Sequence, residues 1–372
     1  MKTGMDKQAG LLPLYLNDFV PGFRPPNSHT GLWYEKFCNV WSQQDGVWTL
    51  GTDKSRWIEG VIGETGDQAG IRELVERMKS MVLRRSGTLL YTKTEGRFVT
   101  GLGRSHPVEN GFAWHPTLGT AYLPGSSVKG LVRSWAERWE EAVDEKDVHR
   151  IFGYQDSSTA SVGSVIFYDA IPLAPIQLEA DVMTPHYGPY YQDGKAPVDW
   201  HAPVPIPFLT VAANQPFLFS LAPRRLGKHE EDVETVMDWL QKALEWIGAG
   251  AKTAVGYGRF VVDKKKQNEW KQALEDQKRE QERQAKLAEM TPVEREMEED
   301  GYDQDSDRFM KVLTDKWLDR MEAEDTPLAD RMEIAQRLAD WYQKYRLDHW
   351  KKPNKKNKEK IRRIQAVLHE ES

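Results

Sequence analysis

The chain has 372 residues, of which 51 are basic and 57 acidic, giving a formal net charge of −6 at pH 7. This length favours more than one domain, and the acidic balance excludes a protein that binds nucleic acid through its overall charge. The single cysteine, Cys38, excludes a disulfide framework and a cysteine-based zinc site, so a reducing, cytoplasmic compartment is expected. Asn17 and Asp18 interrupt the first apolar stretch, so we expect no signal peptide. Since no apolar run reaches the roughly 18 residues of a membrane span, no membrane partner is expected either.

The density of charge changes abruptly near residue 263. Of residues 1–262, 56 are charged, compared with 52 of the last 110 residues. Glycine and proline become scarce at the same point. A shift of this kind indicates a domain boundary. We therefore expect an N-terminal extension at 1–86, a central domain at 87–263 and a charged α-helical extension at 264–372.

In chain order, the first element is a helix with Ile71, Val75, Met78 and Val82 on one face. A strand is predicted at 97–103. A second helix carries Val128, Val132, Trp135 and Trp139 on one face, and a serine after Gly125 is expected to cap its start. Strands follow at 163–170 and 216–221. A helix with Val236, Leu240 and Ile247 precedes the last strand, at 258–262.

The order strand, helix, strand, strand, helix, strand is typical of the α+β, ferredoxin-like (RRM-like) βαββαβ fold. Some sheets of this fold present one face to single-stranded RNA. Residues 171–213 form an insertion between the second and third strands. The extension is predicted to be helical to about residue 290. An acidic stretch at 294–307 is expected to interrupt the helices there. Amphipathic helices are expected at 307–323 and 328–350, and a short terminal helix after the basic run 351–363.

The first candidate functional segment is 101–133, which is rich in glycine and leads into a helix. A helix N-terminus offers free amides to phosphate. The residues expected to bind RNA here are Ser126, Ser127, Lys129 and Arg133. An ordinary capped helix with solvated Lys129 and Arg133 is the alternative.

The second candidate segment is the glycine loop 248–259. Successive glycine amides can line an anion site, although the loop has neither the P-loop sequence nor the dinucleotide-binding fingerprint. The residues expected to contact RNA are Gly248, Gly250, Lys252, Gly256, Tyr257, Gly258 and Arg259. A glycine-rich end to the preceding helix is the alternative.

The insertion supplies a third candidate, because it is rich in aromatic side chains that can stack on unpaired bases. His186, Tyr187 and Tyr190 are the residues proposed to do so, and a subunit-docking arm is the alternative.

The run 351–363 has eight basic residues and one acid; it either neutralises phosphates or is a solvated segment.

Catalysis is not expected. His106, His115 and His186 are scattered, without the spacing of a metal site. Asp169 is an isolated acid for metal-assisted cleavage, with no partner at a telling spacing. We therefore expect no catalytic residue, no metal and no cofactor.

These segments together resemble the RAMP superfamily of CRISPR proteins, and within it the sixth-subunit family of the Cmr-type (type III-B) effector complexes. The resemblance rests on residues 101–133, 167–173, 181–194, 200–211 and 248–260. It implies a ferredoxin-like fold and a non-catalytic, RNA-binding subunit of an antiviral ribonucleoprotein. Such a subunit caps the backbone of the complex near the 3′ side of the guide RNA. Its partners would be guide RNA, target RNA, and the other backbone and small subunits.

Two other functions stay open at this point. The same fold serves guide-processing endoribonucleases, which need a histidine or lysine as general acid or base; His106, His115 and His186 are the candidates. Alternatively, the chain is an interaction scaffold that acts through the aromatic helices of its extension.

Overall fold

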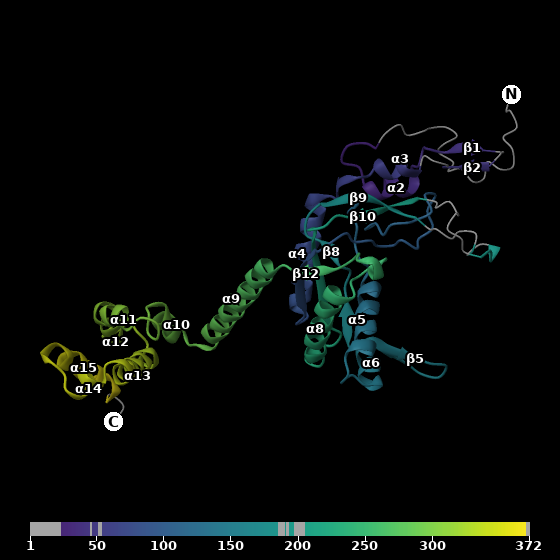
Figure 1. Cartoon of the computed structure of the whole chain (residues 1–372). Helices are drawn as coiled ribbons and strands as arrows, with labels where there is room; N and C mark the ends of the chain where they lie inside the picture. Colours follow the sequence, from purple (N-terminus) through teal and green to yellow (C-terminus); the bar gives the residue numbers. More distant parts are fainter. Residues whose placement is uncertain are drawn as a thin grey trace. The chain divides into compact units, whose positions relative to one another are not determined.

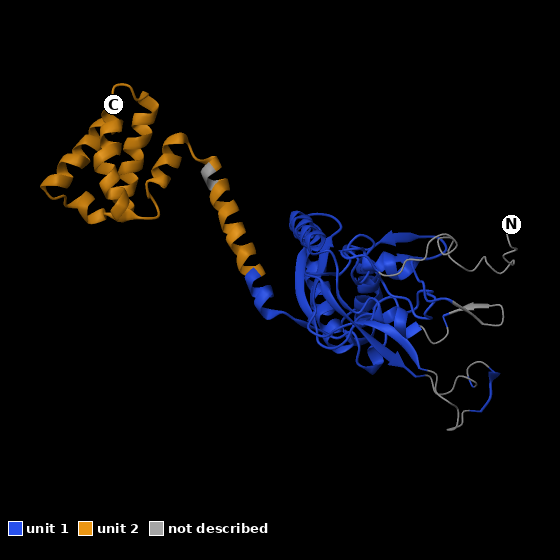
Figure 2. Cartoon of the chain, turned by 90° about the horizontal axis from the view of Figure 1, so that it is seen from above, with its two compact units in different colours: residues 1–269 blue, residues 270–372 orange. Residues whose placement is uncertain are grey.

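A computed structural model describes residues 24–44, 47–50, 54–184, 190, 193–196 and 205–369. The chain forms two compact units, residues 1–269 and 270–372, coloured separately in Figure 2. Helix α9, Lys264–Glu289, begins in the first unit and continues into the second. Among the described residues, no helix combines the length and the apolar character needed to cross a membrane.

The first unit is built on an antiparallel sheet (Figure 1). Its four main strands lie in the order β12-β4-β11-β7, and β8 (Ile171–Pro172) also pairs with β11. Helix α5 (Gly125–Trp139) follows the first main strand and α8 (Glu230–Trp246) the third. In chain order the sheet reads 4-1-3-2, which is the ferredoxin-like arrangement. The predicted fold is confirmed. The four strands are β4 (Thr88–Thr94), β7 (Val165–Phe167), β11 (Pro216–Pro223) and β12 (Phe260–Val262).

The predicted first strand was wrong. Residues 97–103 form no strand; Phe98 makes one isolated bridge with Val211, and Gly101 turns the chain at φ +72°. The first strand is β4, nine residues earlier. It is buried almost continuously, so it lacks the alternation that marks a half-buried strand. The strand predicted at 163–170 is shorter and followed by β8, whereas β11 and β12 agree with prediction within a few residues.

Helices cover both faces of this sheet. Leu90, Phe217 and Phe219 pack into the main core with residues of α5 and α8. On the other face, α4 (Gln68–Arg84) contacts β4 and β11, and Lys79 of α4 lies over the ring of Tyr91. Burying each large apolar side chain contributes about 1.5–3 kcal/mol. Because α4 covers it, the face that related sheets offer to RNA is not open here.

The N-terminal extension and the insertion join in a second sheet. β3 (Gly63–Thr65), β9 (Ile176–Met183) and β10 (Ile206–Val211) lie in the order β10-β9-β3, all antiparallel. The N-terminal extension adds α2 (Thr30–Lys36), α3 (Lys54–Glu59) and the hairpin of β1 (Ser42–Gln44) and β2 (Val47–Thr49). Part of the insertion is therefore integral to the first unit.

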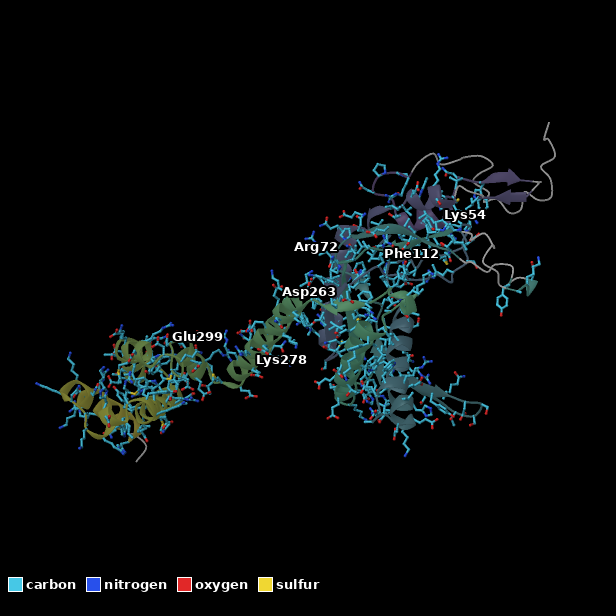
Figure 3. All side chains as sticks on the ribbon, in the orientation of Figure 1. Lys54, Arg72, Phe112, Asp263, Lys278 and Glu299 are labelled. Atoms are coloured by element: carbon cyan, nitrogen blue, oxygen red, sulfur yellow. The ribbon has the colours of Figure 1, made fainter. Side chains whose placement is uncertain are left out.

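Two small elements complete the first unit. Helix α6 (Glu145–Phe152) follows α5 and leads into a hairpin of β5 (Gly153–Gln155) and β6 (Ala160–Val162). At the other end, Asp263, labelled in Figure 3, bonds to Lys93 of β4 at 3.0 Å. Gln267 then extends the edge of β4, since its side chain accepts from the Tyr91 amide and donates to the Leu89 carbonyl.

The second unit is all helical and has its own core. Phe309, Trp317, Leu338 and Trp341 are fully buried within it. The amphipathic helices predicted at 307–323 and 328–350 are confirmed. The acidic stretch 294–307, however, begins inside a helix, and most of the basic run 351–363 lies within the last helix. The helices are α10 (Pro292–Glu299), α11 (Ser306–Val312), the π-helix η4 (Leu313–Trp317), α12 (Leu318–Glu322), α13 (Leu328–Tyr345), α14 (Leu347–Lys351) and α15 (Lys355–Leu368).

Candidate functional site

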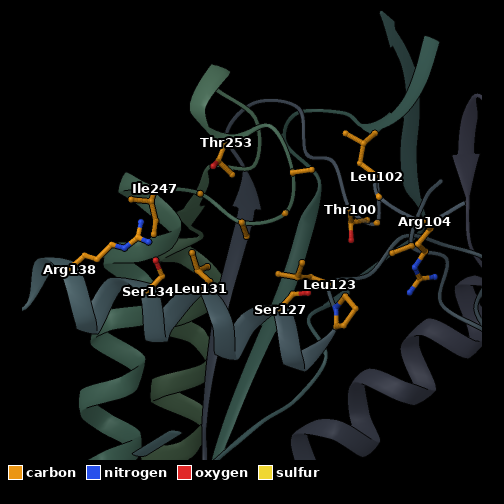
Figure 4. Close-up of a pocket in the computed structure, with 18 of the residues that line it drawn as sticks. Thr100, Leu102, Arg104, Leu123, Ser127, Leu131, Ser134, Arg138, Ile247 and Thr253 are labelled. Carbon is orange, nitrogen blue, oxygen red and sulfur yellow. The ribbon is translucent and has the colours of Figure 1, made fainter. Parts of the chain in front are cut away.

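The two main segments singled out in the sequence line one groove of about 820 Å³ (Figure 4). One wall is a face of α5, formed by Ser127, Leu131, Ser134 and Arg138. These positions follow the i, i+4, i+7, i+11 spacing of a single helix face. Residues 248–251 and Thr253 of the glycine loop form the opposite wall, and residues 100–104 close one end.

Glycine is required in the loop for close approach of backbone to backbone. Gly250 has φ +85°, and a Cβ there would stand 2.1 Å from the Val99 carbonyl oxygen. Gly258 has φ +76°, and its Cβ would stand 1.9 Å from the Ala249 carbonyl oxygen. Both positions exclude any side chain. The glycines therefore set the shape of this wall.

Three of the glycine amides of this loop are engaged within the protein. The Gly248 amide donates to the Ala243 carbonyl at 2.9 Å, and the Gly258 amide donates to Arg97 at 2.8 Å. The Gly256 amide donates to Thr253 in the short 3₁₀ turn η3 (Thr253–Val255). The amides of these three glycines are therefore not free to line an anion site, while RNA contact by the rest of the loop stays a prediction.

The start of α5 also differs from prediction. Its N-cap is Pro124, with no side-chain cap, so the serines do not cap the helix. Instead the Gly125 amide donates to Oδ1 of Asp169 at 2.6 Å. Asp169 thus has a structural role at this helix end. Ser126 and Ser127 lie exposed in the first turn, and Ser127 borders the groove.

Two arginines supply the positive charge of the groove. Arg104 and Arg138 both line it, both are exposed, and neither forms an ion pair with a described residue. In Figure 4 they lie at its two ends. Neither arginine was singled out from the sequence. The signal for Arg138 was its position eleven residues after Ser127, on the same face of α5.

Lys129 and Arg133, by contrast, do not line the groove. They project from a different face of α5, where Arg133 bonds to Glu137 at 2.7 Å. Burial lowers the pKa of Lys129, and the charges of Arg133 and Arg224 lower it further. The structure thus separates these two cations from Ser127, with which they were grouped in the sequence.

The remaining loop residues pack against the insertion. The Lys252 ammonium lies 5.3 Å from the ring centroid of Phe208 on β10. The Tyr257 hydroxyl donates to Oδ2 of Asp181 on β9 at 2.5 Å, and Arg97 donates to the same oxygen at 2.6 Å. Arg259 is exposed. The loop is therefore buttressed by the second sheet.

The aromatic candidates of the insertion are placed only in part. Tyr190 is 47% exposed, whereas His186 and Tyr187 lie outside the described residues.

The ring of His106 stacks on Tyr34 with centroids 4.4 Å apart, and its Nε2 lies 3.2 Å from the Tyr34 carbonyl oxygen. Burial lowers the pKa of His106 and of His115.

Comparison with known proteins gives a consistent set of similarities. Residues 91–261 match the family model of the RAMP superfamily. The chain is 32% identical to the CRISPR system Cmr subunit Cmr6 of Pyrococcus furiosus, over 45% of this chain and 66% of that protein. It is also 32% identical to the corresponding protein of Saccharolobus solfataricus, over 42% of this chain and 50% of that one. The chain thus spans between half and two thirds of the length of these relatives.

Two solved structures are also similar. One is a chain of the type III-B Cmr-beta complex bound to cognate target RNA, with 27% identity and a TM-score of 0.47, covering 58% of this chain and 72% of that one. The other is Cmr6 from Pyrococcus furiosus, with 30% identity and a TM-score of 0.29, covering 47% of this chain and 97% of that one.

Proposed function

Because this chain belongs to the RAMP superfamily, we propose that it is a subunit of a type III-B CRISPR ribonucleoprotein. In this proposal it is a non-catalytic subunit of a cytoplasmic antiviral complex, and it caps the backbone of that complex near the 3′ side of the guide RNA. Its partners are the guide RNA, the bound target RNA, and the neighbouring backbone and small subunits.

The observation that carries the proposal is the single groove lined by both α5 and the glycine loop. A ribose-phosphate chain lying in it would meet Arg104 at one end and Arg138 at the other, with the hydroxyls of Ser127 and Ser134 between them. Guanidinium groups bind phosphate through paired, charge-assisted hydrogen bonds. Contacts of this kind suit a protein that holds the RNA backbone while guide–target pairing supplies the sequence recognition.

The placement of the histidines supports a non-catalytic role. A general acid or base must reach the proton that it transfers. His106 is committed to the core by its stacking on Tyr34, and His115 lies beside Thr117, with its Nδ1 3.4 Å from the Thr117 amide nitrogen. Incubation of the purified chain with repeat RNA tests this part: we expect no discrete products, and products lost in His115→Ala would contradict it.

A pair of variants on one helix tests the groove. Arg138→Glu places a negative charge inside the groove, whereas Arg133→Glu makes the same change on the other face of α5. We expect Arg138→Glu to weaken guide-RNA binding and to reduce its salt dependence. For single strands the slope of log K against log salt changes by about 0.7 for each phosphate that the protein no longer neutralises. Arg133→Glu serves as the matched control for charge and for helix position.

The measurement is a titration of labelled single-stranded guide RNA with the full chain at several salt concentrations. Equal losses in the two variants would mean that α5 acts only through its net charge. A loss confined to Arg133→Glu would move the RNA to the other face and refute the groove.

A further inference from the structure

A second cavity, of about 430 Å³, lies in the first unit and shares no lining residue with the groove. It is enclosed by the end of α6, the turn between β6 and β7, and the segment after β11. Its principal polar residues are His149, Arg150, Ser164, Arg224, Arg225 and His229.

Two arginines give this cavity its charge. Arg224 donates from Nε to the Gly163 carbonyl at 2.7 Å, which holds the guanidinium beside the turn. Its two terminal nitrogens make no hydrogen bond with a described residue. The neighbouring Arg225 is exposed and forms no ion pair within the described part of the chain. Both guanidinium groups therefore have donors available to a ligand.

The acidic groups nearby are already engaged. Arg150 bonds to Asp147 at 2.6 Å and also to Asp232, so its charge is balanced. His149 lies 3.7 Å from Glu145, and His229 lies 3.7 Å from the paired Asp232. The cavity thus keeps the two positive charges of Arg224 and Arg225.

Ser164 adds a buried polar group to the lining. The residue is 4% exposed, and its Oγ is buried without a hydrogen-bond partner among the described residues. Its backbone is fixed on both sides, because its amide donates to Arg150 at 2.9 Å and its carbonyl accepts from Arg224 at 2.7 Å. A buried hydroxyl left unpaired costs about 1–3 kcal/mol. If the Ser164 side chain rotates its hydroxyl into the cavity, a ligand that accepts from it removes that cost.

Lys129 of α5 lies near Arg224. The charge of Arg224 acts on Lys129, as does that of Arg133. Lys129 therefore adds to the positive charge near this cavity, whereas the charge of Arg133 is balanced by Glu137.

We propose that the cavity formed by Arg224, Arg225 and Ser164 is a second anion site of this protein, which binds a phosphate group. Its donors come from separate segments of the chain, an arrangement that suits the tetrahedral oxygens of phosphate better than a planar carboxylate, which one guanidinium edge can satisfy. The site does not depend on the groove, because the two have no residue in common.

Titration calorimetry of the full chain with inorganic phosphate, and with acetate as the carboxylate, tests the site. We expect saturable phosphate binding that is stronger than acetate binding. Arg225→Gln should weaken it about tenfold, which is the effect of removing one charge-assisted hydrogen bond, and Ser164→Ala should weaken it less. Arg72→Gln, a change at an exposed arginine of α4 labelled in Figure 3, should leave it unaltered. Thermal melting of each variant identifies any loss of folding.

A second titration, with single-stranded RNA, identifies the source of the phosphate. If Arg225→Gln weakens RNA binding as well, and adds to the effect of Arg138→Glu, the phosphate belongs to an RNA backbone. If it weakens only inorganic phosphate binding, the site takes a free phosphate group. The proposal is overturned if phosphate does not saturate, or if Arg225→Gln and Arg72→Gln bind it equally well. Phosphate bound in the groove would be lost in Arg138→Glu but kept in Arg225→Gln, so the two variants assign each binding event to its own site, and failure of the groove would leave the Arg225→Gln result intact.

Discussion

Replacing Gly250 by alanine should damage the first unit far more than the same change at Gly256. Both glycines have positive φ, +85° and +97° respectively. A non-glycine residue in this region costs about 1–2 kcal/mol. Around Gly256 nothing lies within 4 Å of the added Cβ, whereas at Gly250 the Cβ would stand 2.1 Å from the Val99 carbonyl oxygen.

At Gly250 the backbone must therefore move, and the adjacent bond from the Ala251 amide to that same carbonyl, now 2.8 Å, would be strained or broken. A hydrogen bond contributes about 0.5–1.5 kcal/mol. We expect Gly250→Ala to cost about 3 kcal/mol and Gly256→Ala about 1 kcal/mol. For a unit of this size these costs lower Tm by roughly 6–12 °C and 2–4 °C.

Differential scanning calorimetry of the full chain measures both variants, and hydrogen exchange of peptides from β4 and the glycine loop assigns the affected transition to the first unit. Because the loop forms one wall of the groove, Gly250→Ala should also weaken RNA binding at temperatures where the chain is still folded. If the Tm values of the two variants lie within roughly 1–2 °C of each other, the strain of the positive φ that both positions share explains both losses. The close approach of the loop to Val99 is then not a determinant of the fold.

Three further outcomes are expected. Since burial lowers the pKa of His106, this imidazole binds a proton more readily in the unfolded chain than in the folded one. The free energy of unfolding should therefore fall as the pH drops below about 6.5. His106→Phe should flatten that dependence, and melting curves across this pH range would show it. Leu338→Ala, at a fully buried position of the second unit, should cost about 3–5 kcal/mol and lower only the calorimetric transition of that unit; a shift of the other transition would contradict the division into two units. Asp169→Ala removes the acceptor of the Gly125 amide and should cost about 1 kcal/mol in chemical denaturation, and an unchanged midpoint would refute this capping role.

Several elements follow from local pattern alone. The apolar faces of α5 and α8 repeat at helical spacing, and the residues on them are the ones that pack into the core. The strand β11 combines aromatic residues with a turn signal on either side. These features are determined by neighbours within a few residues, so they can be predicted without knowledge of the rest of the chain.

Elements buried on both sides were harder to predict. β4 lies in the centre of the sheet with α4 on one face and α8 on the other, so it carries apolar residues without alternation. The stretch at 97–103 offers Phe98, Val99 and Thr100 as strand formers, but Gly101 turns it away from the sheet. Only the packing of distant segments on both faces decided between these two stretches.

The candidate groove divides in the same way. The sequence by itself determined that α5 follows the first strand of the fold and that the glycine loop precedes the last strand. The sheet order 4-1-3-2 places these two strands side by side, and this brings α5 and the loop together. Which residues of α5 face the loop was decided by the tertiary structure, because Val128, Val132 and Trp135 must be buried against the sheet and this fixes the rotation of the helix. That rotation turns Ser127 and Arg138 toward the groove and Lys129 and Arg133 away from it, since a helix has only one orientation in which its apolar face is buried.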